Sequence, residues 1–246
     1  MRIALLISGG GTTMEAIIKA CLPDRQACQN GMLKNIIPAL IISSNENAGG
    51  IEKAKKLGIK NENILVINPK NFKNIEEFGE EIIKECKKRE VNFIGQYGWM
   101  VMTPENVLNE FKGMIVNQHP GPLDTGKLDF GGAGMYGLRV HQARLLFVRK
   151  VNRDFWTEAT AHRVTVKFDE GQILKRRQVP IFEGDTAESL QARVLPIEHE
   201  VQIETLCDFV NNTVSEFIRE KPLVYKGEEK ILEECKELAK KMYPKG

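Results

Sequence analysis

The sequence predicts an α/β protein with a mostly parallel, twisted sheet and helices on both faces. Three observations support this prediction. Short apolar runs recur along the first 117 residues, segments with helical spacing lie between them, and a glycine-rich turn follows the first run. Alternating strands and helices are typical of βαβ units, in which right-handed crossovers join parallel strands.

The first predicted strand, Ile3 to Ile7, is continuously apolar, as expected of a strand covered on both faces. It ends at the run Ser8-Gly9-Gly10-Gly11-Thr12-Thr13. Thr12 followed by Glu15 matches a capping box, which predicts that a helix starts directly after the glycines. Backbone N–H groups and the helix dipole favour an anion at such a place, so we expect either a bound phosphate or a tight turn that only needs glycine.

The other elements of the first half follow in order. Apolar runs predict strands at Ile36 to Ile42, Ile64 to Ile67, Val91 to Tyr97 and Met114 to Val116. Helical spacing predicts helices at Ile51 to Leu57, Ile75 to Lys88 and Pro104 to Phe111. Ligands bind at the carboxyl ends of the strands in such open sheets, so candidate site residues are expected there.

The pattern changes after Asn117. The stretch from His119 to Gly137 is rich in Gly, Pro and Asp and too irregular for one element, which predicts a functional loop. Gly132 to Gly137 matches G-x-G-x-x-G, but no predicted strand precedes it, which disfavours a dinucleotide site. The later elements are expected at Leu138 to Val151 (helix), Ala159 to Phe168 and Gln172 to Ile181 (strands), Thr186 to Arg219 (helix) and Lys226 to Met242 (charged amphipathic helix).

Length and composition set further bounds. A chain of 246 residues fits one large domain with an appendage, and we expect a domain over 1–221 and a C-terminal helical extension over 222–246. Lys and Arg number 35 against 33 Asp and Glu, which gives no electrostatic footprint for nucleic acid. No apolar stretch approaches the roughly 20 residues of a membrane span. The first apolar run is too short for a signal peptide. We therefore expect a cytoplasmic monomer or homodimer with small-molecule partners.

Cysteines and histidines predict neither disulfides nor a metal site. The five cysteines, Cys21, Cys28, Cys86, Cys207 and Cys235, are scattered without a C-x-x-C pair and are expected to be free thiols. No two histidines have the i, i+4 spacing of a helical zinc site, and no cysteine lies near one.

Asn117 and His119 end a predicted strand. Two residues apart on an extended segment, they point to the same side. A second histidine, His162, leads towards Asp169, and a carboxylate near an imidazole favours its charged form and fixes its orientation. On these residues alone, catalytic and structural roles both stay open.

Six short motifs occur in a fixed order over roughly residues 1 to 205. They are Ser8 to Thr13, Gly98-Trp99-Met100, Asn117-Gln118-His119-Pro120, Ala161-His162 with Asp169-Glu170-Gly171, Gly184-Asp185-Thr186, and Glu198-His199. Together they resemble the folate-dependent formyltransferases. The resemblance implies a Rossmann-like sheet and formyl transfer from 10-formyltetrahydrofolate, and it is closest to members that formylate the amine of 5-phosphoribosylglycinamide in de novo purine (IMP) biosynthesis.

The same resemblance implies roles for particular residues. Asn117 and a protonated His119 donate hydrogen bonds to the oxyanion that forms on the formyl group, and Asp169 keeps His119 charged or positions a proton-carrying water. Gly11, Thr12 and Thr13 bind the substrate phosphate, and Glu198 binds the ribose hydroxyls. The implied folate-binding residues are Met100, Val101, Met102, Thr103, Asn117, Thr165, Val166, Lys167, Phe168 and Asp169. No metal is implied.

Several departures from the family lie near this site. Gly121-Pro122-Leu123-Asp124 opens a loop that is longer than usual, Val101 stands where an Arg is frequent, and Thr13 replaces a usual Asn. Two alternatives therefore stay open. In the first, the same catalytic residues transfer the formyl group to another amine, or to water as in formyltetrahydrofolate hydrolase. In the second, the chain is a nucleotide-binding oxidoreductase or a non-catalytic ligand-binding protein. The hydrolases usually carry a further domain, which this chain is not expected to have.

Overall fold

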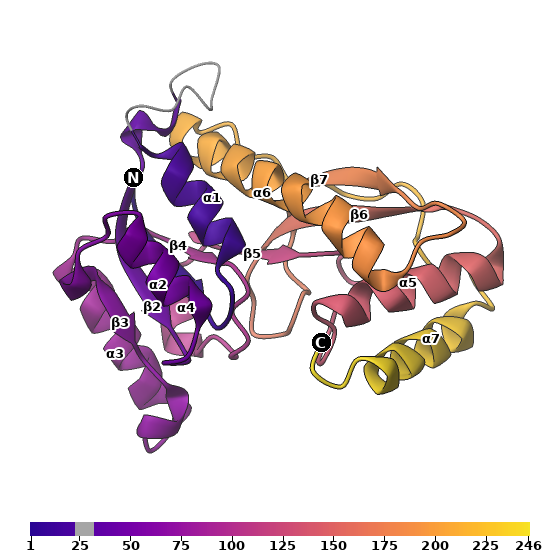
Figure 1. Cartoon of the computed structure of the whole chain (residues 1–246), viewed down its shortest axis with the longest axis horizontal. Coiled ribbons are helices and arrows are strands. Elements are labelled where there is room, and N and C mark those ends of the chain that lie inside the picture. Colours follow the sequence, from indigo (N-terminus) through magenta and orange to yellow (C-terminus); the bar gives the residue numbers. More distant parts are fainter. Residues whose placement is uncertain (23–31) are drawn as a thin grey trace. The chain divides into compact units, whose positions relative to one another are not determined.

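The computed structural model describes residues 1–22 and 32–246, which form two compact units (Figure 1). Unit 1 comprises Met1–Asn117 and Gln202–Val214, and unit 2 comprises Gln118–Val201 and Ser215–Gly246. Cys28, expected to be a free thiol, lies outside the described residues; among the described residues, Cys21, Cys86, Cys207 and Cys235 form no disulfide.

Unit 1 is a parallel sheet with helices. Its strands are β1 (Arg2–Ile7), β2 (Ile37–Ser43), β3 (Ile64–Val66), β4 (Phe93–Gln96) and β5 (Ile115–His119), the last of which runs on into unit 2. Its helices are α1 (Thr12–Ala20), α2 (Gly49–Lys56), α3 (Ile75–Lys88) and α4 (Glu105–Glu110), with short 3-10 helices at Met32–Asn35, Asn61–Asn63 and Pro69–Asn71. The strand order is β3-β2-β1-β4-β5, and all four pairs of neighbouring strands are parallel.

Burial of β1 explains its continuous apolar run. Residues 3–7 are all fully buried, because β1 lies between β2 and β4 and helices cover both faces of the sheet. Helix α1 contacts α2, and α3 contacts α4. Since right-handed crossovers run in opposite directions on the two sides of β1, these pairs cover opposite faces. The carboxyl ends of β1 and β4 flank the point where the strand order reverses, which is the usual ligand crevice of such sheets.

Unit 2 contains the rest of the secondary structure. Its elements are α5 (Leu138–Val151), β6 (Trp156–Arg163), β7 (Ile173–Pro180), the first part of α6 (Ala187–Asn211) and α7 (Glu229–Met242). Here the strand order is β5-β6-β7, and β6 and β7 pair antiparallel. The prediction of an α/β fold with a mostly parallel sheet is thus confirmed.

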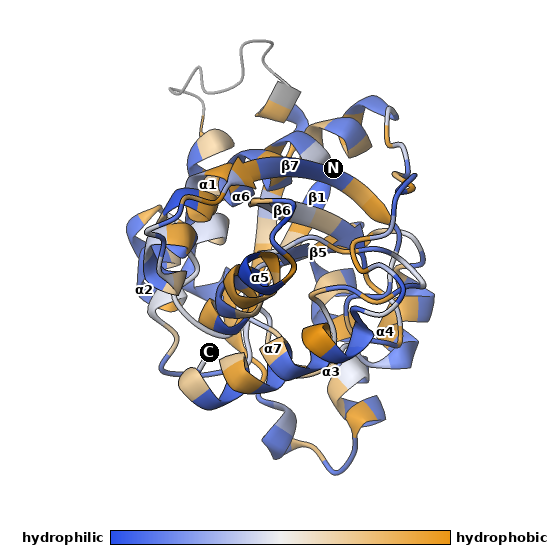
Figure 2. Ribbon diagram, turned by 90° about the vertical axis from the view of Figure 1, so that its right-hand side faces the viewer, coloured by the Kyte–Doolittle hydropathy of each residue, from blue (hydrophilic) through white to orange (hydrophobic). Residues whose placement is uncertain are grey.

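Helices α5 and α7 pack side by side (Figure 1). Figure 2 shows α7 in alternating hydrophilic and hydrophobic bands, as expected of an amphipathic helix. Its buried residues join those of α5 and of the loop before it in one hydrophobic cluster: Phe130, Met135, Val140, Ala143, Phe147, Leu223, Val224, Leu232, Cys235 and Ala239. The predicted C-terminal helix is therefore an integral part of the unit 2 core, while the boundary proposed at residue 221 stays a prediction.

Two predicted elements are too long. The helix expected to reach Arg219 ends at Asn211, because Asn212 adopts a left-handed conformation with φ 55°. Thr213 N–H then donates to Asp208 and Asn212 N–H to Phe209, the paired bonds of a Schellman motif. An Asn after a helical run is a signal for such an end.

The strand expected over Ala159 to Phe168 ends at Arg163. Its partner strand begins at Ile173, and the chain reverses between them, with Arg163 N–H donating to the Gln172 carbonyl over 2.9 Å. Gly171 makes the reversal possible, since a Cβ there would stand 1.7 Å from the Arg163 carbonyl oxygen. The apolar residues of the loop resemble a strand only in composition.

Candidate active site

The turn after β1 leads straight into α1 in unit 1. Gly11 has φ 62° and is the N-cap residue, so Thr12 is already helical and the predicted capping box is wrong. The Glu15 side chain instead forms ion pairs with Lys19 and Lys53.

Glycine is required at position 11 for space as well as conformation. A Cβ there would stand 2.8 Å from the Cα of Gly50, whose N–H donates to the Gly9 carbonyl over 3.1 Å. The hydroxyl of Thr13 is buried, and no partner for it occurs among the described residues. The first N–H groups of α1 have no acceptor within the helix, so this turn offers donors to an anion.

The segment after β4 is tied to the same turn. Ser8 N–H donates to the Gly98 carbonyl over 3.0 Å, and Met100 N–H donates to Ser8 Oγ over 2.9 Å. Gln96 closes the segment by donating from Nε2 to Thr103 Oγ1 over 2.5 Å. Met100 and Met102 keep 54% and 48% of their surface exposed, so two large apolar side chains stand open beside the turn.

Strand β5 carries Asn117 and His119 at its carboxyl end. The imidazole of His119 is 2% exposed, and its Nδ1 lies 3.6 Å from Oδ2 of Asp169. On the other side of Asp169, Oδ1 lies 3.5 Å from Nε2 of His162. Unit 2 therefore brings together one buried carboxylate and two imidazoles.

Backbone geometry fixes the position of Asp169. The residue adopts φ 59° in the loop between β6 and β7, and Gly132 N–H donates to its Oδ2 over 2.9 Å. A Cβ on the neighbouring Gly131 would stand 2.7 Å from the Asp169 Cβ, so glycine is needed for this close approach.

Burial and charge determine the protonation of this group. Burial lowers the pKa of His119 to about 4, although the carboxylate of Asp169 and a hydrogen bond with the Phe130 backbone oppose that shift. For Asp169, burial acts to raise the pKa, but the imidazoles of His119 and His162 and the Gly132 amide outweigh it and lower the pKa to about 2. In the free protein His119 is consequently neutral near pH 7, contrary to the expectation that Asp169 keeps it charged. Its Nε2 has no hydrogen-bond partner among the described residues.

His162 was not among the predicted catalytic residues. The structure places it on β6 with Nδ1 2.8 Å from the Arg163 carbonyl oxygen and with its other nitrogen bonded to Asp169. Both ring nitrogens are thereby engaged, which orients the ring and the carboxylate together. Its occurrence in the motif that precedes Asp169 was the available signal.

Glu198 is a buried carboxyl on α6. It is 4% exposed, its Oε1 has no partner within the described part of the chain, and burial raises its pKa to about 7. Such a group is stabilised by any ligand that brings hydroxyl donors to it.

The predicted folate-binding stretch from Thr165 to Phe168 lies in the β6–β7 loop directly before Asp169. Val166 and Phe168 are 57% and 43% exposed, and Thr165 Oγ1 donates to the Lys167 carbonyl over 3.0 Å. The loop thus presents apolar side chains next to the buried carboxylate.

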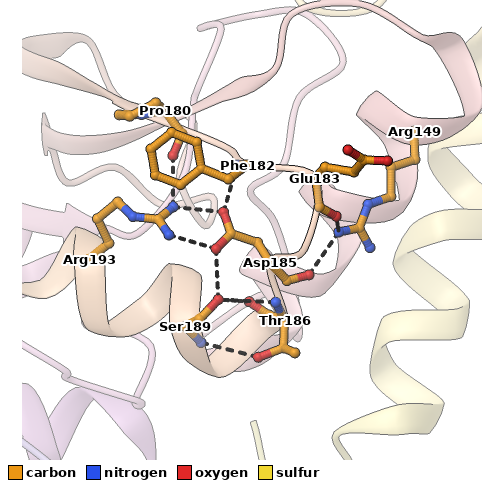
Figure 3. Close-up of polar contacts among 8 residues, drawn as sticks. All are labelled: Arg149, Pro180, Phe182, Glu183, Asp185, Thr186, Ser189 and Arg193. Atoms are coloured by element: carbon orange, nitrogen blue, oxygen red, sulfur yellow. Dashed lines mark hydrogen bonds and ion pairs between the residues drawn. The ribbon is translucent and has the colours of Figure 1, made fainter.

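The Gly184-Asp185-Thr186 motif has a structural role, which Figure 3 shows. Arg193 donates two hydrogen bonds to Asp185 over 2.7 and 2.6 Å, and Asp185 also accepts from Phe182 N–H and Ser189 Oγ. Thr186 and Ser189 cap each other's backbone N–H groups at the start of α6. The arginine bonds hold the pKa of Asp185 well below its usual range. This network fixes the start of the helix that carries Glu198.

No group of three or more His, Cys, Asp or Glu side chains within 1–22 and 32–246 is arranged to hold a metal ion. Over the same ranges, none of the helices has the length and apolar character needed to cross a membrane.

Comparison with known proteins identifies relatives of this chain. It is 30% identical over 206 residues to the chloroplastic phosphoribosylglycinamide formyltransferase of Vigna unguiculata, covering 83% of this chain and 59% of that protein. The enzyme of the same name from Escherichia coli is 27% identical over 201 residues, which cover 82% of this chain and 83% of that one. The chain spans only 59% and 64% of the lengths of the Vigna and Arabidopsis thaliana relatives.

Solved structures agree. The phosphoribosylglycinamide formyltransferase of Brucella melitensis superposes with a TM-score of 0.68 at 29% identity, over 88% of this chain and 98% of that one. Glycinamide ribonucleotide transformylase 1 of Symbiobacterium toebii gives a TM-score of 0.70 at 27% identity, over 86% and 88%.

The family model described as formyl transferase matches residues 1–206 of the 246. That range contains both the glycine turn of unit 1 and the carboxylate with its two imidazoles in unit 2. The family implies a formyl donor of the folate type and small-molecule substrates. The chain belongs to the formyl transferase family.

Proposed function

We propose that this chain transfers the formyl group of 10-formyltetrahydrofolate to the amine of 5-phosphoribosylglycinamide. The observation that carries the proposal is the buried His119, whose Nδ1 faces Asp169 and whose Nε2 has no partner among the described residues. The choice of acceptor is supported by relatives named for this activity. One of them is the Escherichia coli protein, and the match covers 83% of its length.

The chemistry assigned to the site is acyl transfer. The substrate amine attacks the formyl carbon, a C–N bond forms, and negative charge collects on the formyl oxygen. The bond from that carbon to N10 of the folate then breaks, and one proton passes from the amine to N10. Neutral His119 can accept the proton at Nε2, and as the cation it can donate to the oxyanion, together with the Asn117 amide. Asp169 favours that cation once the negative charge develops.

Binding roles follow from the same proposal. The N–H groups after Gly11 and the hydroxyls of Thr12 and Thr13 bind the phosphate, because they are donors at a helix N-terminus. Glu198 accepts from the ribose hydroxyls, which supply the donors that its carboxyl lacks. The segments Met100 to Thr103 and Thr165 to Asp169 bind the folate, with Val101, Met102, Val166, Lys167 and Phe168 around its ring. The compartment, the monomeric or homodimeric state and the absence of nucleic-acid or membrane partners stay predictions.

The test is folate-product absorbance after mixing the purified chain with 10-formyltetrahydrofolate, with and without 5-phosphoribosylglycinamide. We expect release of tetrahydrofolate only when the acceptor is present. Release without acceptor would identify a hydrolase, and no release in either mixture would overturn the proposed acceptor. A matched variant, Gly11→Val, should raise KM for the phosphorylated acceptor and leave KM for the folate unchanged.

A further inference from the structure

The loop from Gly121 to Gly137 receives several of its contacts from the last quarter of the chain. Phe130 and Met135 of this loop lie in the hydrophobic cluster formed with α5 and α7. Arg219 Nε donates to the Leu123 carbonyl over 2.5 Å. Arg219 and the cluster residues of the C-terminal segment, from Leu223 to Ala239, lie beyond residue 206, where the match to the family model ends.

One contact from α7 reaches the neighbourhood of the candidate catalytic carboxylate. Lys236 Nζ donates to the Gly131 carbonyl over 2.8 Å. The next N–H group, that of Gly132, donates to Asp169 Oδ2 over 2.9 Å. The Gly131 carbonyl and the Gly132 N–H belong to the same planar peptide group. An ammonium group therefore bonds to one end of this peptide and a carboxylate accepts from the other.

Such an arrangement strengthens both hydrogen bonds. A cation on the carbonyl oxygen polarises the amide and makes its N–H a better donor, the more so where water is scarce. Asp169 is only 10% exposed at its side chain. Lys236 is partly buried, and burial lowers its pKa, while Asp129, Asp169 and Glu170 favour the charged form. The carboxylates around the ammonium thus offset part of its desolvation, and its pKa stays below the usual value.

We propose that Lys236 is a positioning residue for Asp169, acting through the Gly131–Gly132 peptide. The inference rests on the proposed function of the site, and it extends that site to α7, outside the family-matched residues. Lys236 itself touches neither substrate nor the reacting atoms in this assignment. Its role is to hold the peptide that orients the carboxylate behind His119.

The kinetic test compares Lys236→Met with Lys241→Met, an exposed lysine on the same helix. We expect Lys236→Met to lower kcat by roughly tenfold to a hundredfold, as misplacement of a catalytic group does, with both KM values nearly unchanged. Lys236→Arg retains the cation and should keep most of the activity. Wild-type kcat in Lys236→Met would overturn the proposal. If that variant fails to fold, Lys236→Gln, which keeps a donor but no charge, replaces it with the same criteria.

A second readout does not need turnover. NMR of the free protein follows the Gly132 amide shift and the His119 titration in the wild type and both Met variants. His119 is faced by Asp169, His162 and His141 as well as Lys236, whose positive charge lowers its pKa. We expect Lys236→Met to shift the His119 pKa and move the Gly132 amide, and Lys241→Met to do neither. Unchanged spectra in Lys236→Met would overturn the positioning role of Lys236. If the wild type shows no turnover but the variant shows these spectral shifts, only the proposed function would be refuted.

Discussion

Asp169 and Glu198 are both buried carboxyl groups of unit 2, yet their pKa values shift in opposite directions. Burial acts to raise the pKa of each. Around Asp169, two imidazoles and a backbone amide reverse that effect, and the pKa falls to about 2. Glu198 has no such opposing group, and its pKa rises to about 7. The difference teaches that the groups around a carboxyl decide its charge more than its burial does. Asp169 is held as an anion by its neighbours, whereas Glu198 lacks hydrogen-bond donors that a ligand could supply.

The largest expected effect is that of Asp169→Asn. The amide can still accept from Gly132 N–H but no longer carries the charge that favours a cationic His119. We expect kcat to fall by about 10²- to 10⁴-fold, the range for a general acid–base group. Steady-state rates across pH check this, because the acid limb of the profile should move as well. An unchanged profile would reduce Asp169 to a structural role.

Glu198→Gln should act on binding rather than on chemistry. Loss of a charge-assisted hydrogen bond to the ribose is expected to raise KM for the nucleotide substrate roughly tenfold, with kcat retained. Glu200→Gln is the control, since Glu200 lies two residues further on the same helix and is 55% exposed at its side chain. Equal effects of the two substitutions would remove Glu198 from the binding site.

Glu198→Gln also tests whether the pKa of Glu198 is raised in the folded protein. A carboxyl whose pKa is raised in the fold stabilises the protein fully below its ordinary pKa of 4.5, and this contribution is lost as pH rises through about 7. The loss amounts to roughly 3 kcal/mol. Urea unfolding at pH 5 and pH 8 should therefore show Glu198→Gln gaining stability over the wild type as pH rises. For Asp169 the shift is opposite, so Asp169→Asn should lose relative stability as pH rises from 2 to 5.

Gly131→Ala is expected to have the smallest effect. Its Cβ would stand 2.7 Å from the Cβ of Asp169 and 2.7 Å from Leu123 Cδ2, so the carboxylate must shift slightly. We expect a loss of about 1–3 kcal/mol in the free energy of unfolding. We expect kcat to fall several-fold, less than tenfold. Gly184→Ala, where nothing lies within 4 Å of the new Cβ, should change neither quantity. Thermal unfolding and kcat, measured on the same samples of both variants, test this prediction. Equal values for Gly131→Ala and Gly184→Ala would contradict it.

The sequence predicted the sheet of unit 1 well, because strands buried on both faces must be continuously apolar. It predicted α5 to the residue, since the helical spacing there is uninterrupted between Leu138 and Val151. The predicted end of the strand at Phe168 was wrong, since β6 ends at Arg163. The composition of Val164 to Phe168 does not reveal the chain reversal that Gly171 allows.

The site was predicted less completely. Local motifs pointed to Asn117, His119 and Asp169, but the neutral state of His119 depends on burial, which no motif encodes. The contribution of Lys236 depends on a contact between positions 105 residues apart. Pairings at that separation follow from packing of α7 on α5 rather than from any local pattern.

Cys235 lies in the contact between α5 and α7, at 1% exposure, and burial raises the pKa of its thiol. A thiol reagent can therefore reach it only when α7 separates from α5, because the thiolate is the reactive form and the packed helix excludes the reagent. The labelling rate of Cys235 measures how frequently α7 opens, and a ligand that orders the Gly121 to Gly137 loop should slow it. This native cysteine makes the chain a reporter of its own local unfolding without an introduced labelling site.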